Sequence, residues 1–267
     1  MKLNNENYYS QEANMEYMSN SQLKDFLKCE KEALAKIKGE IVEEKTDALY
    51  FGGYVDAYFS GELEQYKLDN PDMFNTRTGE LKAPFKNIEE VIKAIEDDEW
   101  LMKALSGEKQ KIMTGTIEGV KFKIKIDSYI KDYMIVDQKI IKDLDLLWVE
   151  QNGRNVKTDF IEAHGYDIQG AIYQEIVRQN IGKRLPFVLA ITTKQENPDK
   201  ALIEIDQEYL DRALDLVKAV APRYQAIKEG KVEPVGCGKC PTCRKDRKVE
   251  GIVSYKKFFN KPNLESE

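Results

Sequence analysis

Histidine is almost absent from this chain of 267 residues, in which His164 is the single example. Triads that hydrolyse esters or peptides need a histidine base beside a serine or cysteine nucleophile, so such a mechanism has little support here. The sequence contains no P-loop motif, and ATP hydrolysis by the chain is therefore not expected. Internal repeats and low-complexity segments are also missing, and we expect disorder only at the ends.

Long apolar runs are missing as well. No stretch approaches the length that crosses a bilayer, and the N-terminus lacks the apolar segment of a secretory signal. We therefore expect a cytoplasmic protein that has no membrane partner and keeps its thiols reduced. In that setting the four cysteines are better candidates for metal ligands than for disulfides.

Positive charge is in deficit, because 41 lysines and arginines face 47 aspartates and glutamates, for a net charge of −6. This balance argues against a protein that coats nucleic acid through bulk positive charge. It is compatible with a nuclease whose basic groups are confined to one groove. It also fits an active site rich in carboxylates that await cations.

The order of periodic segments indicates an α+β or mixed α/β domain, and we interpret the fold as α/β. Helices are expected between the Ser19–Ser21 cap and Gly39 and over about 47–59, 88–105, 164–180 and 207–228. Strands are expected over about 110–117, 120–130, 133–139, 186–192 and 201–205. We expect a flexible N-terminal segment (1–17), one domain (18–248) that includes a cysteine motif at 237–243, and a C-terminal tail (249–267).

An acidic pair is predicted within the strand meander. A three-residue loop at 131–133 sets a register in which Asp127 lies directly opposite Asp137, whereas a two-residue loop would break this register. Two facing carboxylates repel each other unless a cation compensates them, and hard oxygen ligands select Mg²⁺ or Mn²⁺. Lys139 follows on the same face as Asp137 and could orient or deprotonate an attacking water. These residues are a candidate phosphodiesterase centre.

Alone, an Asp and a Lys two residues apart on a strand are more often solvated surface. The surrounding motifs change that balance, because the chain resembles the PD-(D/E)XK nuclease superfamily and, more closely, the RecE-type phage and prophage exonucleases. Ser19–Cys29 is similar to the S-x-S-x-L-x-x-F-x-x-C opening of RecB-like nucleases. Asp127, followed by Asp137-Gln138-Lys139, resembles their D…(D/E)-x-K pair.

The resemblance also implies roles for residues outside that pair. Asp56 stands where a G-x-x-x-H segment usually has a metal-binding histidine, and a carboxylate there can also ligate the metal. The backbone carbonyl of Gln138 would touch the same ion. Gln169 and Tyr173 match a Q-x-x-x-Y helix motif. With Tyr166 they could contact the scissile phosphate or stack on DNA, and ordinary helix packing is the alternative.

The resemblance covers about residues 18–248 and implies a restriction-endonuclease-like mixed central sheet flanked by helices. It implies a Mg²⁺-dependent exonuclease that digests linear duplex DNA from 5′ to 3′ in phage-type homologous recombination within a bacterial host cell. A ring-shaped homo-oligomer and a single-strand annealing recombinase as partner are implied as well. Lys121, Lys123 and Lys125 alternate along one strand face and could line the DNA path.

The cysteines fall into two groups, Cys29 near the start and Cys237, Cys240 and Cys243 near the end. This one-plus-three pattern resembles the [4Fe–4S] site of some RecB-like nucleases. A Zn²⁺ site with four cysteines is the second interpretation, and four unliganded thiols are the third.

Two rival functions remain open from the sequence. One is an iron–sulfur RecB-like nuclease of the CRISPR-adaptation type. The other is a DNA-binding or scaffold protein that keeps the fold but cleaves nothing, and Asp56 in place of histidine favours it. Cleavage of linear DNA with Mg²⁺ would separate an enzyme from a scaffold.

Overall fold

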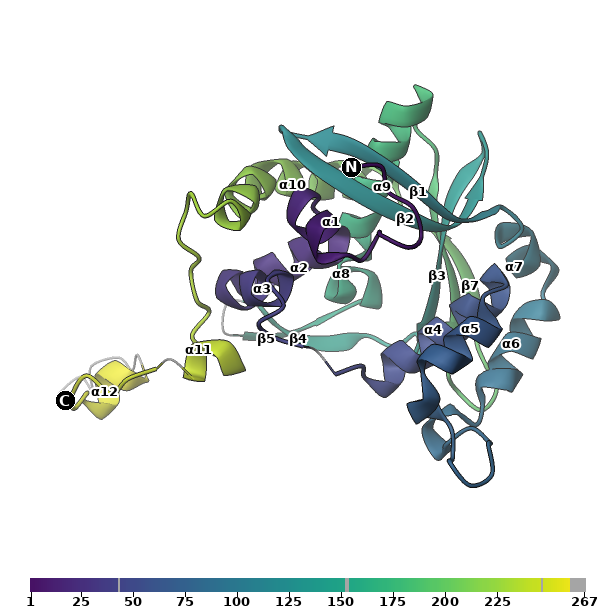
Figure 1. Cartoon of the computed structure of the whole chain (residues 1–267), viewed down its shortest axis with the longest axis horizontal. Coiled ribbons are helices and arrows are strands. Elements are labelled where there is room, and N and C mark those ends of the chain that lie inside the picture. Colours follow the sequence, from purple (N-terminus) through teal and green to yellow (C-terminus); the bar gives the residue numbers. More distant parts are fainter. Residues whose placement is uncertain (43, 152–153, 246, 260–267) are drawn as a thin grey trace, which may run out of the picture.

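A five-stranded mixed sheet forms the centre of the protein in a computed structural model that describes residues 1–42, 44–151, 154–245 and 247–259 (Figure 1). The strand order is β1-β2-β3-β6-β7. These strands are β1 (Glu108–Ile117), β2 (Val120–Ile130), β3 (Met134–Ile141), β6 (Phe187–Thr193) and β7 (Lys200–Glu204). β3 and β6 run parallel, and the other neighbouring pairs are antiparallel. The predicted mixed α/β architecture is confirmed.

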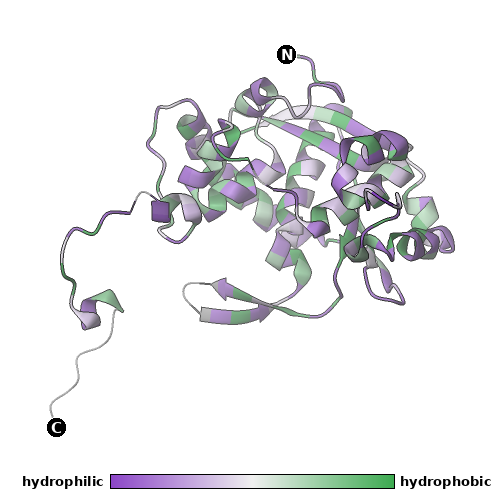
Figure 2. Ribbon diagram, turned by 60° about the horizontal axis from the view of Figure 1, so that its bottom comes forward, coloured by the Kyte–Doolittle hydropathy of each residue, from purple (hydrophilic) through white to green (hydrophobic). Residues whose placement is uncertain are grey.

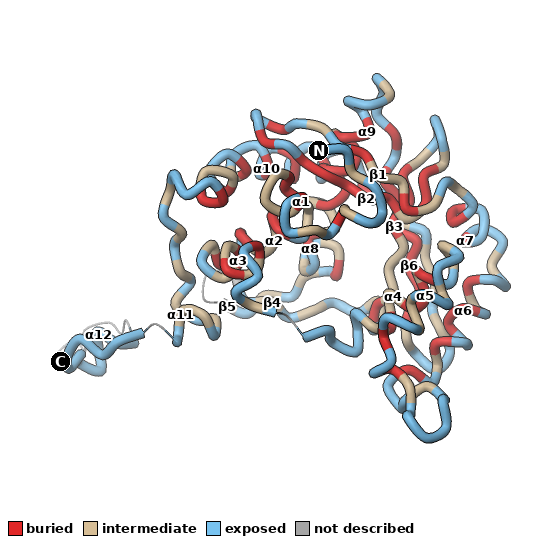
Figure 3. Tube along the Cα trace, viewed as in Figure 1, coloured by how far each residue is buried: buried red, intermediate tan, exposed pale blue. Residues whose placement is uncertain are grey.

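Helices cover both faces of the sheet, and each face has its own hydrophobic core. One core involves α2 (Asn20–Lys28), α9 (Tyr166–Ile181) and α10 (Gln207–Lys228), and the other involves α4 (Asp47–Ser60), α6 (Ile88–Glu96) and α7 (Glu99–Ala104). Successive residues of β6 alternate between them, as a pleated strand requires: Phe187, Leu189 and Ile191 enter the first core, and Val188 and Ala190 the second. Figure 3 shows the buried strands between helices whose outer faces are exposed.

Two predicted helices are each divided in the structure. The helix expected between the Ser19–Ser21 cap and Gly39 is α2 followed by α3 (Glu30–Ile37), because Cys29 between them is extended, with φ −164° and ψ 112°. The helix expected over 88–105 is α6 followed by α7, which Asp98 caps by accepting from the N–H groups of the first turn. Apolar periodicity did not reveal either break.

The N-terminal segment expected to be flexible contains α1 (Gln11–Glu16) and several buried side chains. These are Tyr8, Ala13 and Tyr17. Met18 then pairs in parallel with Phe122 of β2. Lys123 is only 1% exposed, and its ammonium donates to the Tyr8 carbonyl and, over 2.7 Å, to Asn14 Oδ1. A buried lysine of β2 thus fastens this segment to the sheet.

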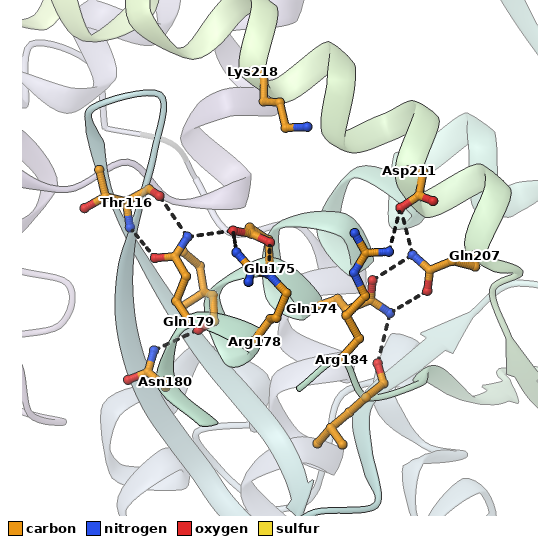
Figure 4. A network of polar contacts seen from close by, with 12 residues as sticks. Thr116, Gln174, Glu175, Arg178, Gln179, Asn180, Arg184, Gln207, Asp211 and Lys218 are labelled. Atoms are coloured by element: carbon orange, nitrogen blue, oxygen red, sulfur yellow. Dashed lines mark hydrogen bonds and ion pairs between the residues drawn. The ribbon is translucent and has the colours of Figure 1, made fainter. Parts of the chain in front are cut away.

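Hydrogen bonds and a close approach fix α9 against the sheet. Gln179 accepts from the Thr116 N–H (2.9 Å) and donates to the Thr116 carbonyl (2.8 Å), so it pairs with the edge of β1 (Figure 4). A Cβ atom on Gly170 would lie 2.6 Å from the Phe187 ring, so this position requires glycine. The predicted site residue Gln169 is adjacent to that contact.

The remaining elements lie around this body. They are α5 (Leu63–Asp69), the 3₁₀ helices η1 (Pro71–Met73) and η2 (Ala83–Phe85), α8 (Phe160–His164), α11 (Pro241–Lys245) and α12 (Tyr255–Phe258). β4 (Leu147–Gln151) and β5 (Arg154–Thr158) form a separate hairpin that projects from the body (Figure 2). Within the described ranges, no helix combines the length and apolar character needed to traverse a bilayer.

Candidate active site

A cavity of about 690 Å³ lies where the pairing of β2 with β3 ends. The last paired residues there are Ser128 and Val136, in the register that the sequence predicts, and Asp127 and Asp137 come next on the two strands. The Gln138 N–H donates to Asp127 Oδ2 over 2.9 Å. A side-chain carboxylate thus satisfies a strand N–H and is directed between the two strands.

The carboxylates of Asp127, Asp137 and Asp56, which α4 contributes, line this cavity, as does that of Asp25, which pairs with Lys36 over 3.4 Å. Asp137 is 2% exposed, and Gln169 Nε2 donates to its Oδ1 over 2.5 Å. The Asp137 Oδ2 atom is buried and has the Lys139 ammonium as its ion-pair partner. The acidic residues and the lysine predicted from sequence therefore line the same cavity.

The carboxylates in this cluster destabilise one another's charged forms. Burial raises the pKa of Asp127 well above its usual range, and the carboxylates of Asp137 and Asp56 raise it further. Burial also raises the pKa of Asp56. Burial alone would lower the pKa of Lys139, but Asp137 and Asp127 outweigh it and raise that pKa above its ordinary value. One lysine therefore compensates this acidic cluster only in part.

The donor set fits a hard divalent cation. Oxygen ligands are those that Mg²⁺ and Mn²⁺ prefer, and Asp56, Asp127 and Asp137 offer carboxylate oxygens around one cavity. Burial and repulsion between neighbouring carboxylates raise the pKa values of Asp127 and Asp56, a cost that a bound cation would remove.

Replacement of Asp127 by asparagine should stabilise the metal-free protein because it removes a desolvated charge from an acidic cluster. We expect the thermal midpoint in a chelating buffer to rise by about 2–4 °C, which corresponds to about 1 kcal/mol in a chain of this size. The folded-state pKa of Asp127 lies above 3.8. Its ionisation therefore lowers stability as pH rises through that pKa, and the gain from asparagine should be larger at pH 8 than at pH 5. Calorimetry at both pH values measures this; an equal or lower midpoint in the variant would contradict it.

Three other predicted residues, all on α9, make their contacts with protein groups. Gln169, 6% exposed, holds Asp137 as described above. The Tyr173 hydroxyl donates to the Lys125 carbonyl over 3.1 Å, and the residue is 8% exposed. The Tyr166 ring centre lies 5.3 Å from Lys139 Nζ. In this structure the helix motif contacts the backbone of β2 and the side chains of Asp137 and Lys139 on β3.

The predicted lysine stripe is interrupted. Lys121 forms a 2.8 Å ion pair with Glu16 and does not line the cavity, and Lys123 is buried under the N-terminal segment. Lys125 is half-buried, lines the cavity and lies 5.0 Å from the Tyr9 ring centre. Strand alternation placed the three lysines on one face correctly, but it could not reveal that residues 8–17 cover part of that face.

Sequence reasoning missed two polar residues of the cavity. Lys24 of α2 donates to the His164 carbonyl over 3.0 Å, and burial, followed by repulsion from Lys139, lowers its pKa to about 8. Gln110 of β1 donates to both carboxylate oxygens of Asp56. Neither residue stands out in sequence, because Lys24 has the appearance of a helix-surface cation and Gln110 stands between two lysines.

The four cysteines converge at a second site. All four Sγ atoms lie within 4.8 Å of one another. Cys29 Sγ is 3.6 Å from Cys243 Sγ and 3.7 Å from Cys240 Sγ, so these contacts are too long for disulfides. Backbone N–H groups of Lys239 and Cys240 donate to Cys237 Sγ and lower the pKa of that thiol to about 6. This arrangement can hold a metal.

Comparisons with known proteins agree with this geometry. Residues 19–246 match the model of a family described as a PDDEXK-like domain of unknown function (DUF3799). The crystal structure of a protein described as a putative exonuclease from Eubacterium rectale, solved at 2.19 Å resolution, is similar to this chain with a TM-score of 0.89. The two chains are 49% identical, and the match covers 97% of this chain and 98% of that one. No curated protein matches the chain.

Proposed function

Since the chain belongs to the PDDEXK-like family, we propose that it is a deoxyribonuclease that depends on Mg²⁺ or Mn²⁺. The observation that carries this proposal is the cluster of Asp56, Asp127 and Asp137 with Lys139 on the wall of one cavity. The resemblance of the whole chain to a protein described as an exonuclease supports it.

The residues of the chain would divide the work of phosphodiester hydrolysis. A bound divalent cation polarises a phosphoryl oxygen and makes a water more acidic. Asp56, Asp127 and Asp137 would hold that cation together with the carbonyl of Gln138. In the metal-free protein Asp137 and Asp127 raise the pKa of Lys139 and keep its ammonium protonated. Lys139 would orient the attacking water and offset developing charge.

Residues around the acidic cluster would orient its side chains and place one lysine in contact with DNA. Gln169 orients the Asp137 carboxylate through its 2.5 Å hydrogen bond. Tyr166 flanks the Lys139 ammonium, and Tyr173 supports the backbone of Lys125, whose side chain would contact a phosphate.

We propose further that the substrate is the end of a linear DNA duplex, digested from 5′ to 3′. This follows the resemblance to RecE-type enzymes, and with it the chain would act in phage-type recombination in the bacterial cytoplasm. By the same resemblance, the protein would assemble into a homo-oligomeric ring and act with a single-strand annealing recombinase as partner. Residues 18–248 would form the nuclease domain and 249–267 a tail.

For the cysteine site, we propose one Zn²⁺ ion in preference to a [4Fe–4S] cluster. Four thiolates bound tetrahedrally to one ion at about 2.3 Å lie about 3.8 Å apart. The Cys29–Cys243 and Cys29–Cys240 sulfur distances of 3.6 and 3.7 Å are close to that value. In a [4Fe–4S] cluster each thiolate binds a different iron, which spreads the sulfurs farther apart.

Linear duplex DNA labelled at either the 5′ or the 3′ end tests the activity and its direction together. With Mg²⁺ we expect stepwise release of the 5′ label first, and no release after the metal is chelated. A covalently closed circle is the matched control and should remain intact. Release of the 3′ label first would contradict the direction, and degradation of the circle would indicate endonuclease action. No cleavage with Mg²⁺ or with Mn²⁺ would favour a scaffold protein that keeps the fold but cleaves nothing.

A further inference from the structure

One residue of the central sheet has a backbone conformation that strands normally exclude. Gln110 of β1 has φ +50°, in the left-handed region that side chains other than glycine rarely adopt. Among the described residues, the other two non-glycine residues with positive φ are Glu118 and Asp132, and both lie in turns. Such strain inside a strand persists only where the surrounding contacts impose it.

The position of this strained residue is next to the acidic cluster. The β1–β2 pairs on either side of it, Lys109–Ser128 and Lys111–Ile126, place Gln110 level with Asp127. The Gln110 side chain lines the same cavity, and the residue is 8% exposed. The strain is therefore located at the proposed metal centre.

The contact that Gln110 makes is specific. Its Nε2 atom donates to Asp56 Oδ1 over 3.0 Å and to Oδ2 over 3.1 Å, so one amide engages both carboxylate oxygens. An amide is neutral. A lysine or arginine here would neutralise Asp56, whereas glutamine restrains the carboxylate and leaves its negative charge available to a cation.

We propose that Gln110 is a positioning residue that holds the Asp56 carboxylate toward the divalent cation shared with Asp127 and Asp137. This inference rests on the proposed nuclease function. Partners of metal ligands orient those ligands, and their loss typically lowers metal affinity about 10–100-fold. Asp56 needs such a partner because it comes from α4, whereas the two other acids come from adjoining strands.

Two substitutions separate this role from ordinary packing. Gln110→Asn and Gln110→Gly both tolerate positive φ, but asparagine is one methylene too short to keep the contact and glycine has no side chain. We expect neither variant to lose thermal stability in chelating buffer. Both should need at least about tenfold more Mn²⁺ for half-saturation in direct binding followed by electron paramagnetic resonance, and more Mg²⁺ for half-maximal DNA cleavage.

Glu118→Gly is the matched control, since it relieves a positive φ in the β1–β2 turn, away from the cavity. It should bind Mn²⁺ like the wild type. Wild-type Mn²⁺ affinity in both Gln110 variants, with normal cleavage, would overturn this inference and leave the proposed function standing. A loss of thermal stability in both variants without a shift in Mn²⁺ affinity would assign Gln110 a packing role. A wild-type protein that neither binds Mn²⁺ nor cleaves DNA would overturn both proposals.

Discussion

Replacement of Lys139 by alanine is expected to lower kcat for DNA cleavage by about 10³-fold and to leave DNA affinity nearly unchanged. The reason is the position of its ammonium, which pairs with Asp137 and lies in the cavity with Asp127 and Asp56. Charge there acts on the transition state in a partly desolvated site, where a cation has a larger effect than in water. Single-turnover cleavage with saturating enzyme and Mg²⁺ measures this loss, and fluorescence anisotropy in Ca²⁺ measures binding.

Lys142→Ala is the matched control for that experiment, since Lys142 follows the same strand and its side chain is 93% exposed. It should cleave like the wild type. The Lys139 variant leaves a buried carboxylate without its ion-pair partner, so its thermal midpoint is measured alongside. Unchanged cleavage by a folded Lys139→Ala protein would refute the assigned role of this lysine.

Replacement of Cys29 by serine is expected to release the metal of the cysteine site and lower the thermal midpoint by roughly 10 °C. Cys29 is 4% exposed and lies between α2 and α3, so a metal there ties this junction to the segment that carries Cys237, Cys240 and Cys243. A loss of about 4 kcal/mol, modest for a structural zinc site, corresponds to a shift of this size. Metal analysis of the purified protein and calorimetry measure the two effects.

Thr242→Ala lies between two motif cysteines and keeps all four thiols, so it serves as the control. It should retain the metal. The wild type should contain about one zinc per chain and no iron, as expected for a tetrahedral thiolate site. Several irons per chain with visible absorbance would support the iron–sulfur cluster, and a metal-free wild type would contradict the site altogether.

Local patterns were sufficient to predict much of the fold. The strand meander, its three-residue loop and the register around Asp127 and Asp137 are confirmed, and α10 spans the residues expected from its periodicity. The breaks at Cys29 and Asp98 were missed because an apolar stripe continues across them. Cys29 converges with the C-terminal motif, a long-range contact that periodicity does not report, whereas Asp98 is a local N-cap that a count of apolar positions passes over.

The site was predictable to the extent that its residues share strand faces and motifs. Asp127, Asp137 and Lys139 follow from alternation and register, and Asp56 and Gln169 from the family resemblance. The burial of Lys123 and the contact of Gln110 with Asp56 depend on segments that are distant in sequence. No pattern in the sequence indicates these contacts. Gln110 was therefore overlooked, and Lys123, which is buried, was predicted to line the DNA path.

Crystals of the wild-type protein grown with Mn²⁺, and measured by anomalous diffraction at the manganese edge, would test the metal centre most directly. We predict a manganese peak within the cavity, in contact with carboxylate oxygens of Asp56, Asp127 and Asp137. The same crystals of Asp137→Asn should show a much weaker peak or none. A wild-type cavity without manganese, or a peak of equal height in the variant, would contradict the claim that these carboxylates gather a divalent cation.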